Sequence, residues 1–279
     1  MATPTTLYVS DLDGTLLNPE AKISATTADI LSRLIADEGL LFTIATARTP
    51  ATAVPMTEAI GIRLPMIVMT GAAKWVPIEN RYIDTSLLPA EKVAEIVEIC
   101  HSGGINPFIY DIDTDETLRV SHCEELNRGE LSFIEERVNS PFKHFYLHNP
   151  LKVGQALLMY ACNDFERISQ VHARVQQSGG CEAICYHDIY NANQGFLEVF
   201  APGTSKAAAI RQLAKSIGAE RIVVFGDNLN DIPMLRCADV AVAVENAYPE
   251  VKQIAHVVIG PNSSDSVARW IAADVERNR

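Results

Sequence analysis

Two pairs of aspartates follow two short apolar stretches of the chain. Asp11 and Asp13 follow residues 7–9 after one intervening serine, and Asp227 and Asp231 come after residues 221–225. Side chains two residues apart in an extended segment point to the same side, so Asp11 and Asp13 would project together. Carboxylates this close repel one another and require a cation or a shared proton. If both loops lie at one sheet edge, the four carboxylates form a site for Mg²⁺, which prefers hard oxygen ligands.

A magnesium ion beside a carboxylate nucleophile indicates phosphoryl transfer. Asp11 would attack phosphorus and form an aspartyl-phosphate, while Asp13 would protonate the leaving oxygen and later activate water. The metal would neutralise charge on the transferred group. Thr46 offers a hydroxyl to phosphate oxygens, and Lys206 supplies a fixed positive charge. Each residue alone has an ordinary explanation as a cap, turn or surface group, so the prediction depends on their combination after buried strands.

The segments that carry these residues have the order of an α/β fold. Buried parallel strands alternate with helices, which predicts a doubly wound, Rossmann-like sheet with helices on both faces. Ligands of such sheets bind at the carboxyl ends of the strands, where Asp11, Asp13, Thr46 and Thr70 all lie. The expected strands are 7–9, 40–46, 66–70, 221–225 and 239–244, and the expected helices are 24–38, 203–218 and 267–275.

The middle of the chain has a different pattern. After a hairpin over 74–83, helices alternate with strands that look antiparallel. We expect an α+β cap domain over 85–192, inserted into a core formed by 1–84 and 193–279. The segments expected there are helices at 89–100 and 164–177, strands at 107–110 and 117–120, and an apolar run at 155–160.

Composition narrows the classes of partner. The chain has 279 residues and a formal net charge of -12, which disfavours a nucleic-acid partner because nucleic acids are bound mainly through Lys and Arg. Its six cysteines form no CxxC pair, which argues against a zinc site and favours a reducing cytoplasm. Residues 1–6 lack the features of a signal peptide, and the apolar runs are too short to span a bilayer. We expect a cytoplasmic monomer or small homo-oligomer whose partner is a small phosphorylated metabolite, with no membrane partner.

Four segments together resemble the motifs of the haloacid-dehalogenase-like (HAD) superfamily. Residues 11–17, DLDGTLL, are similar to its first motif, and residues 45–48, ATAR, to its second. Lys206 is similar to the third, and residues 226–231, GDNLND, to the fourth. A large α+β cap after the third strand resembles the Cof-type sugar phosphatase subgroup.

The resemblance implies a role for each matching residue. Asp11 would be the nucleophile and Asp13 the general acid/base, with Thr46 and Lys206 holding the phosphate. Asp227 would bind Mg²⁺ together with Asp11 and the backbone carbonyl of Asp13, and Asp231 would complete or orient that site. The remaining residues expected to contact substrate or phosphate are Gly14, Ala47, Arg48, Thr70, Gly71 and Asn230.

Two positions depart from the pattern of the subgroup. Ala47 stands where glycine is usual, and Thr70 stands where asparagine is usual. We expect both to alter substrate preference or rate without abolishing the chemistry. The substrate itself is left open among hexose, polyol, phosphoglycerate and cofactor phosphates. Two alternative functions remain: a phosphomutase that uses the same intermediate, and a non-catalytic regulatory protein that binds phosphate.

Overall fold

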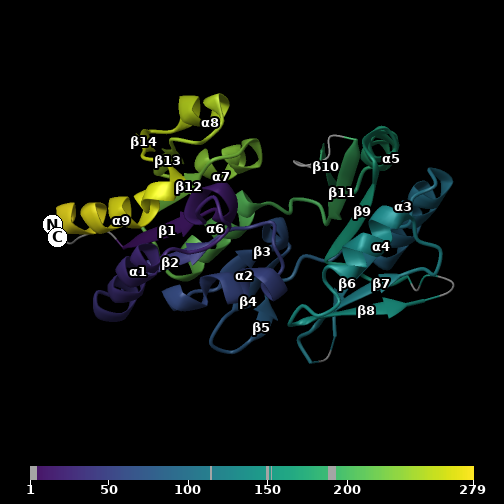
Figure 1. Cartoon of the computed structure of the whole chain (residues 1–279), viewed down its shortest axis with the longest axis horizontal. Helices are drawn as coiled ribbons and strands as arrows, with labels where there is room; N and C mark the ends of the chain where they lie inside the picture. The colour runs from purple at the N-terminus through teal and green to yellow at the C-terminus, as the bar shows by residue number, and fades with distance from the viewer. Residues whose placement is uncertain (1–4, 114, 149–150, 152, 188–192) are drawn as a thin grey trace. The chain divides into compact units, whose positions relative to one another are not determined.

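The chain forms two compact units. The computed structural model describes residues 5–113, 115–148, 151, 153–187 and 193–279. The first unit comprises Met1–Ile83 and Ser205–Arg279, and the inserted unit comprises Asp84–Thr204 (Figure 1). The return to the core was expected at residue 193, whereas the observed units divide between residues 204 and 205. Residue 192 and the start of the N-terminal segment 1–6 lie outside the described residues.

A five-stranded parallel sheet forms the centre of the first unit. Its order is β14-β13-β12-β1-β2, and every neighbouring pair is parallel. β1 is the middle of three adjoining strands, with β12 on one side and β2 on the other. The strands are β1 (Thr6–Ser10), β2 (Leu41–Ile44), β12 (Arg221–Gly226), β13 (Val240–Val244) and β14 (Val257–Ile259).

Helices cover both faces of this sheet, as expected for a doubly wound fold. On one face the Tyr8 hydroxyl donates to Asp274 at 2.9 Å, and Phe225 contacts Trp270 with ring centroids 5.4 Å apart. On the opposite face Val9 and Val224 are fully buried as well. The helices are α1 (Ala25–Asp37), α2 (Pro50–Thr57), α6 (Lys206–Ser216), α7 (Ile232–Leu235), α8 (Pro249–Ile254) and α9 (Ser266–Arg277).

The third expected strand differs from the prediction. β3 (Met66–Val68) ends two residues early because Met69 and Thr70 have positive φ angles of 47° and 58° and turn the chain. A single parallel bridge between Ala45 and Ile67 joins it to the end of β2. Its other neighbour is antiparallel, in a three-stranded sheet with β4 (Ala73–Val76) and β5 (Arg81–Ile83), the expected hairpin.

The inserted unit is an α+β unit, as predicted. Its sheet has the order β10-β11-β9-β6-β7-β8, antiparallel except for the β7–β8 pair. Two of its helices bury apolar side chains with those of the strands in one cluster that includes Val93, Ile96, Ile168 and Val171. The elements are α3 (Ala90–Ser102), β6 (Phe108–Ile112), β7 (Leu118–His122), α4 (Arg128–Glu135), β8 (Lys143–Leu147), β9 (Leu158–Asp164), α5 (Phe165–Ser178), β10 (Glu182–His187) and β11 (Gln194–Phe200). Among the described residues of both units, none of the helices is long and apolar enough to cross a membrane.

Candidate active site

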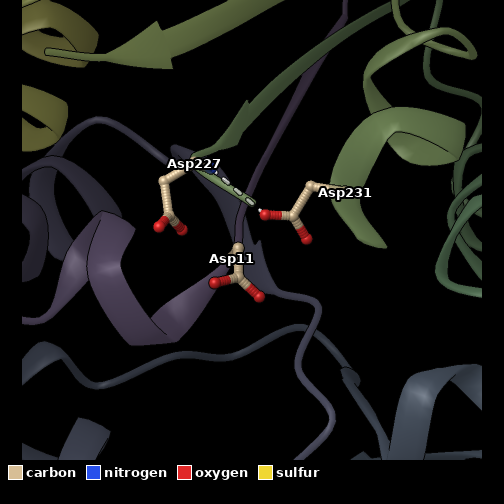
Figure 2. A group of neighbouring side chains, drawn as sticks. All are labelled: Asp11, Asp227 and Asp231. Atoms are coloured by element: carbon tan, nitrogen blue, oxygen red, sulfur yellow. Dashed lines mark hydrogen bonds between the residues drawn. The ribbon is translucent and has the colours of Figure 1, made fainter. Parts of the chain in front are cut away.

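Three carboxylates converge at the carboxyl edge of the parallel sheet in the first unit. Asp11 directly follows β1 and Asp227 directly follows β12, and the two strands are neighbours in register. The Asp11 backbone N–H donates to the Phe225 carbonyl at 2.9 Å, which extends that pairing to the site. Asp231 lies four residues beyond Asp227, at the end of a short 3-10 helix over Leu229–Asp231. One oxygen from each carboxylate lies within 4.8 Å of the others. Figure 2 shows the three side chains gathered together.

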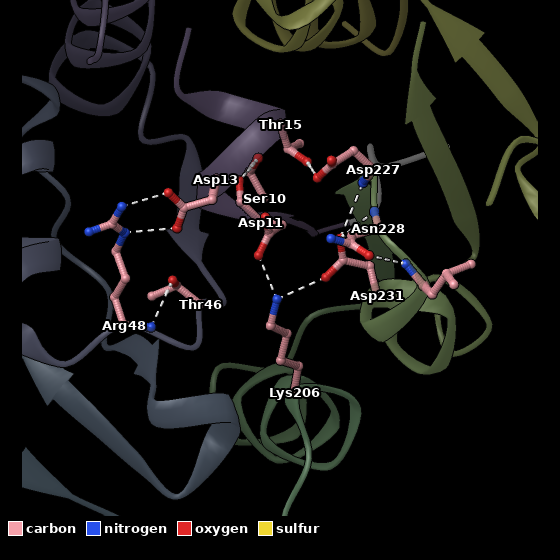
Figure 3. A network of polar contacts seen from close by, with 11 residues as sticks. Ser10, Asp11, Asp13, Thr15, Thr46, Arg48, Lys206, Asp227, Asn228 and Asp231 are labelled. Carbon is pink, nitrogen blue, oxygen red and sulfur yellow. Dashed lines mark hydrogen bonds and ion pairs between the residues drawn. The ribbon is translucent and has the colours of Figure 1, made fainter. Parts of the chain in front are cut away.

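Lys206 enters this cluster from the first residue of α6. The helix begins there because the Ser205 side chain accepts a hydrogen bond from the Ala208 N–H at 3.1 Å, as an N-cap does. The ammonium donates to Asp11 at 2.5 Å and to Asp231 at 2.8 Å (Figure 3). Only 4% of the lysine is exposed, so the two ion pairs are shielded from water.

Asp227 is oriented by its neighbours. The Thr15 hydroxyl donates to its Oδ1 at 2.8 Å. The backbone of Gly14 passes so close that a Cβ at this position would lie 2.4 Å from Asp227 Oδ2, and its φ is +77°. The backbone N–H groups of Asp227 and Asn228 both donate to Asp231 Oδ2 at 3.2 Å. Asp231 therefore anchors the loop as well as contributing charge.

The electrostatics of this cluster favour a bound cation. Burial raises the pKa of the Asp11 carboxyl well above its usual range, and Asp231 raises it further, while Lys206 opposes the shift. Burial also raises the pKa of Asp227, to about 6, against the hydrogen bond from Thr15. Burial lowers the pKa of Lys206, but Asp11 and Asp231 outweigh it and raise the value above normal. Three carboxylates face one ammonium group, so the residues fit a divalent cation that prefers oxygen ligands.

Asp13 lies beside the cluster and has a different partner. Its carboxylate is 51% exposed and accepts two hydrogen bonds from Arg48, from Nε at 2.8 Å and from Nη2 at 2.7 Å. Figure 3 shows the carboxylate turned toward this guanidinium. The bonds to Asp13 raise the pKa of Arg48, partial burial opposes them, and the charges of Asp13 and Asp11 add to the increase. The carboxylate of Asp13 is thus outside the group that could hold the metal through side chains.

The other expected phosphate residues lie around the ends of β2 and β3. Thr46 is buried, and its hydroxyl accepts a hydrogen bond from the Arg48 N–H at 3.1 Å. Its carbonyl accepts from the Thr70 N–H at 3.0 Å, so the two loops are tied together. Ala47, which follows Thr46 in the first loop, is exposed, and Gly71 has a φ of +97° in the second. The loop at Thr46 and the turn at Gly71 therefore form one connected rim.

Some contacts of the site had no counterpart in the sequence analysis. Thr15 was part of a motif but had no role, and the pairing of Arg48 with Asp13 was not foreseen. Asn246 donates to the Gly14 carbonyl at 2.7 Å and accepts from the Asn262 N–H at 2.9 Å, which holds the glycine turn in place. A Thr four residues after Asp11 could have been recognised as a hydroxyl donor, but nothing in the sequence indicates the partner of Asn246. Asn230 is exposed in the turn before Asp231.

Comparison with known proteins places this arrangement in a family. Residues 8–271 match the sequence profile of the haloacid dehalogenase-like hydrolases. The protein named pyridoxal phosphate phosphatase YbhA, from Escherichia coli (strain K12), is 25% identical over 96% of this chain and 97% of its own. The 5-amino-6-(5-phospho-D-ribitylamino)uracil phosphatase YitU of Bacillus subtilis (strain 168) is 27% identical over 97% and 98%.

Solved structures share the fold of the whole chain. A haloacid dehalogenase-like hydrolase from Bacteroides thetaiotaomicron superposes with a TM-score of 0.77 at 21% identity, over 97% of this chain and 99% of that one. A sugar phosphatase of HAD subclass IIB superposes with a TM-score of 0.72 at 24% identity, over 97% and 99%. These likenesses extend over both units of the chain.

Proposed function

The chain belongs to the haloacid dehalogenase-like hydrolase family, as a phosphatase of the Cof type that acts on small phosphorylated molecules, and from this premise we propose a mechanism that forms an aspartyl-phosphate on Asp11 with Mg²⁺ as cofactor. The observation that carries the proposal is the cluster of Asp11, Asp227 and Asp231 around Lys206. In a purely structural ion-pair network, buried negative and positive charges would balance. Here three carboxylates face one ammonium group, and the excess negative charge lies at the carboxyl edge of a parallel sheet, where ligands bind.

Asp11, Asp227 and the backbone carbonyl of Asp13 would hold the Mg²⁺. When bound, the ion offsets the negative charge that accumulates on the phosphoryl group during transfer. Asp231 would position the site without binding the ion. One of its oxygens accepts from Lys206, and the other accepts from the backbone of the Asp227 loop. Lys206 is shared between Asp11 and Asp231, which keeps the Asp11 side chain in one orientation.

In the first step an Asp11 oxygen attacks phosphorus, and the bond from phosphorus to the leaving oxygen breaks. Asp13 gives its proton to that oxygen, so the alcohol leaves in its neutral form. In the second step Asp13 takes a proton from water, the resulting oxygen nucleophile attacks phosphorus, and the Asp11 carboxylate is released with inorganic phosphate. Thr46, with the loop of Ala47 and Arg48 and the turn of Thr70 and Gly71, would hold the phosphate oxygens, and Asn230 would help to orient the metal loop.

The proposed substrate is a small metabolite phosphate, with sugar phosphates as the first group to examine. The superposed subclass IIB protein is named as a sugar phosphatase. The two sequence relatives are named for pyridoxal phosphate and for a phosphoribitylamino-uracil, so phosphates of heteroaromatic compounds form the second group. We propose that the first unit carries the chemistry and that the inserted unit selects the substrate, in a cytoplasmic monomer or small homo-oligomer.

The decisive experiment is phosphate release from a panel that contains both groups of compounds. Wild type and Asp11→Asn are compared with Mg²⁺ and with EDTA. The proposal expects release only from wild type with Mg²⁺, together with acid-stable, base-labile labelling of wild type by a ³²P-phosphorylated substrate. Full activity in Asp11→Asn would refute the nucleophile. Phosphate return to a second position of a sugar, stimulated by a sugar bisphosphate, would support the phosphomutase instead.

A further inference from the structure

The pair formed by Arg48 and Asp13 is a partly exposed contact of the site. The guanidinium and the carboxylate meet through two parallel hydrogen bonds, and the two side chains are 28% and 51% exposed. Both oxygens of Asp13 are occupied in this arrangement. To place a proton on a leaving oxygen, the Asp13 carboxyl has to turn at least one oxygen away from the guanidinium, so at least one of the two bonds has to break.

The backbone around Arg48 is fixed while its side chain is not. Its N–H donates to Thr46 Oγ1 at 3.1 Å, and its carbonyl accepts from the Met69 N–H at 3.0 Å. The guanidinium lies at the end of a long side chain that is partly exposed, so it can change partner while the loop stays in place. Breaking an exposed ion pair costs little compared with breaking a buried one.

The charges of the site indicate what the new partner is. Lys206 is buried and its charge is already shared with two carboxylates, so a phosphate dianion would need a further positive group. A phosphate dianion entering beside Asp11 would meet Asp13 as a like charge and Arg48 as an opposite one. Carboxylate and phosphate bind a guanidinium through the same bidentate geometry, so they compete for it.

We propose that Arg48 exchanges partners when substrate binds, leaving Asp13 for the phosphate and thereby releasing the Asp13 carboxylate to act on the leaving oxygen. This inference rests on the proposed function, because it takes Asp13 as the proton donor. Arg48 then touches the substrate phosphate and is a binding residue for every substrate, whatever the organic part.

A double-mutant cycle on inorganic phosphate binding tests the exchange without turnover. Wild type, Asp13→Asn, Arg48→Gln and the double variant are titrated calorimetrically with phosphate in the presence of Mg²⁺. If Asp13 and phosphate compete for Arg48, Asp13→Asn tightens phosphate binding by about tenfold, as expected for a charge-assisted hydrogen bond of about 1.5 kcal/mol or more. That gain should disappear in the Arg48→Gln background. An equal gain in both backgrounds, or no gain in either, would overturn the exchange.

Kinetics with two leaving groups separates exchange from simple positioning. p-Nitrophenyl phosphate releases a stable anion, whereas an alkyl phosphate from the panel needs protonation of its leaving oxygen. The exchange predicts that Arg48→Gln lowers kcat/KM for both compounds by a similar factor, about 10- to 100-fold, since the phosphate contact is lost for both. Because kcat/KM reports only the steps up to release of the leaving group, Asp13→Asn should lower it for the alkyl phosphate alone, although the later attack of water is slowed for both compounds. If Arg48→Gln also affected only the alkyl phosphate, Arg48 would merely hold Asp13, and the proposal would be wrong.

Two controls keep the outcomes distinct. Arg269→Gln removes another arginine–aspartate pair of the first unit, on α9, and should leave both compounds and the phosphate affinity unchanged. Equal melting temperatures for Arg48→Gln and wild type would exclude general loss of folded protein. A failure of the proposed function would appear in wild type as absent turnover, whereas a failure of the exchange would leave wild-type turnover intact.

Discussion

Asp227 is a buried carboxylate, and the positive charge of Lys206 alone does not fully offset the negative charge of the cluster to which Asp227 belongs. Its pKa is raised to about 6, from an ordinary value of 3.8, chiefly by burial. A group with a raised pKa favours the folded state in its protonated form. The stability it contributes is full below the ordinary value and is lost as pH rises through about 6. Without a cation, the ionised side chain therefore destabilises the fold at neutral pH.

The replacement Asp227→Asn should relieve this cost. In EDTA at pH 8 we expect the variant to be more stable than wild type by roughly 2 kcal/mol, since the shift of about two pKa units corresponds to about 1.4 kcal/mol each and neighbouring water reduces it. The difference should shrink toward zero by pH 5 to 4. Urea denaturation at both pH values measures it. Adding Mg²⁺ at pH 8 should reverse the order, and a variant that is less stable than wild type in EDTA would contradict the prediction.

Thr70 holds a backbone conformation that suits its side chain poorly. Its φ of 58° lies in the left-handed region, which β-branched residues rarely adopt and which asparagine tolerates much better. We expect Thr70→Asn to raise the free energy of unfolding by about 1 kcal/mol, within the usual cost of such a residue. Thermal unfolding checks this, with Thr52→Asn on α2 as a helical control that should gain nothing. An unchanged or lower melting temperature for Thr70→Asn would show that the turn is relaxed with threonine.

At the scale of elements, the turn after β3 and the start of α6 depend on each other. A Cβ on Gly71 would lie 2.4 Å from the Ser205 carbonyl oxygen, and Ser205 is the N-cap that begins the helix at Lys206. The position of the lysine is thus set by a turn more than a hundred residues earlier in the chain. Gly71 precedes the inserted unit in the sequence and Ser205 follows it, and the two residues lie close together through a turn and a helix start.

Gly71→Ala should therefore reduce activity through Lys206. The matched control is Gly39→Ala, because Gly39 has a similar positive φ of 69° but no atom within 4 Å of the added methyl group. Both variants should carry the backbone strain of about 1 kcal/mol that alanine has in this region, and only Gly71→Ala should also displace the helix start. Melting temperatures and kcat on the best substrate measure the two effects. Equal losses of activity would show that the contact with Ser205 is unimportant.

The main strands of the parallel sheet were predictable because each contains a short run of buried, mostly apolar residues that ends in a loop. β1, β2, β12 and β13 all have this form. Their alternation with helices in the sequence predicted the fold class. In the inserted unit, α4, β8, β10 and β11 were not predicted. β10 alternates weakly and is half exposed, and α4 has only eight residues with a single buried one, so the hydrophobic period gives little signal.

Side-chain partners at the site were harder to predict than the elements. That Asp11, Asp227 and Lys206 lie together follows from strand order and from the helix that precedes β12. The pairing of Arg48 with Asp13 depends on the rotamers of both side chains and on the position of the loop that follows β2. No local sequence pattern predicts either of these. The strand expected at 66–70 was too long because Met69 and Thr70 have ordinary strand propensity, and the turn is imposed by tertiary contacts.

At the scale of the whole molecule, every residue of the acidic cluster belongs to the first unit. Replacing residues 84–204 by a flexible linker of about ten Gly and Ser residues should leave that unit folded, since its sheet and helices bury their own core. We expect the shortened protein to bind Mg²⁺ and to hydrolyse p-nitrophenyl phosphate, while the differences among metabolite phosphates fall to within about tenfold. Calorimetric titration and kcat/KM values measure this. Preserved discrimination would place substrate selection in the first unit.

The pairing of β1 with β12 joins Val9 to Val224 and has a consequence for how the protein is made. A chain emerging from the ribosome presents β1 and β2 long before β12 exists, so the inner edge of β1 has no partner for most of synthesis. All residues of the inserted unit have been synthesised by residue 204, so this unit can fold while the edge of β1 is still unpaired. The acidic cluster is therefore assembled last. The nascent protein should depend on chaperones until the final quarter of the chain is translated.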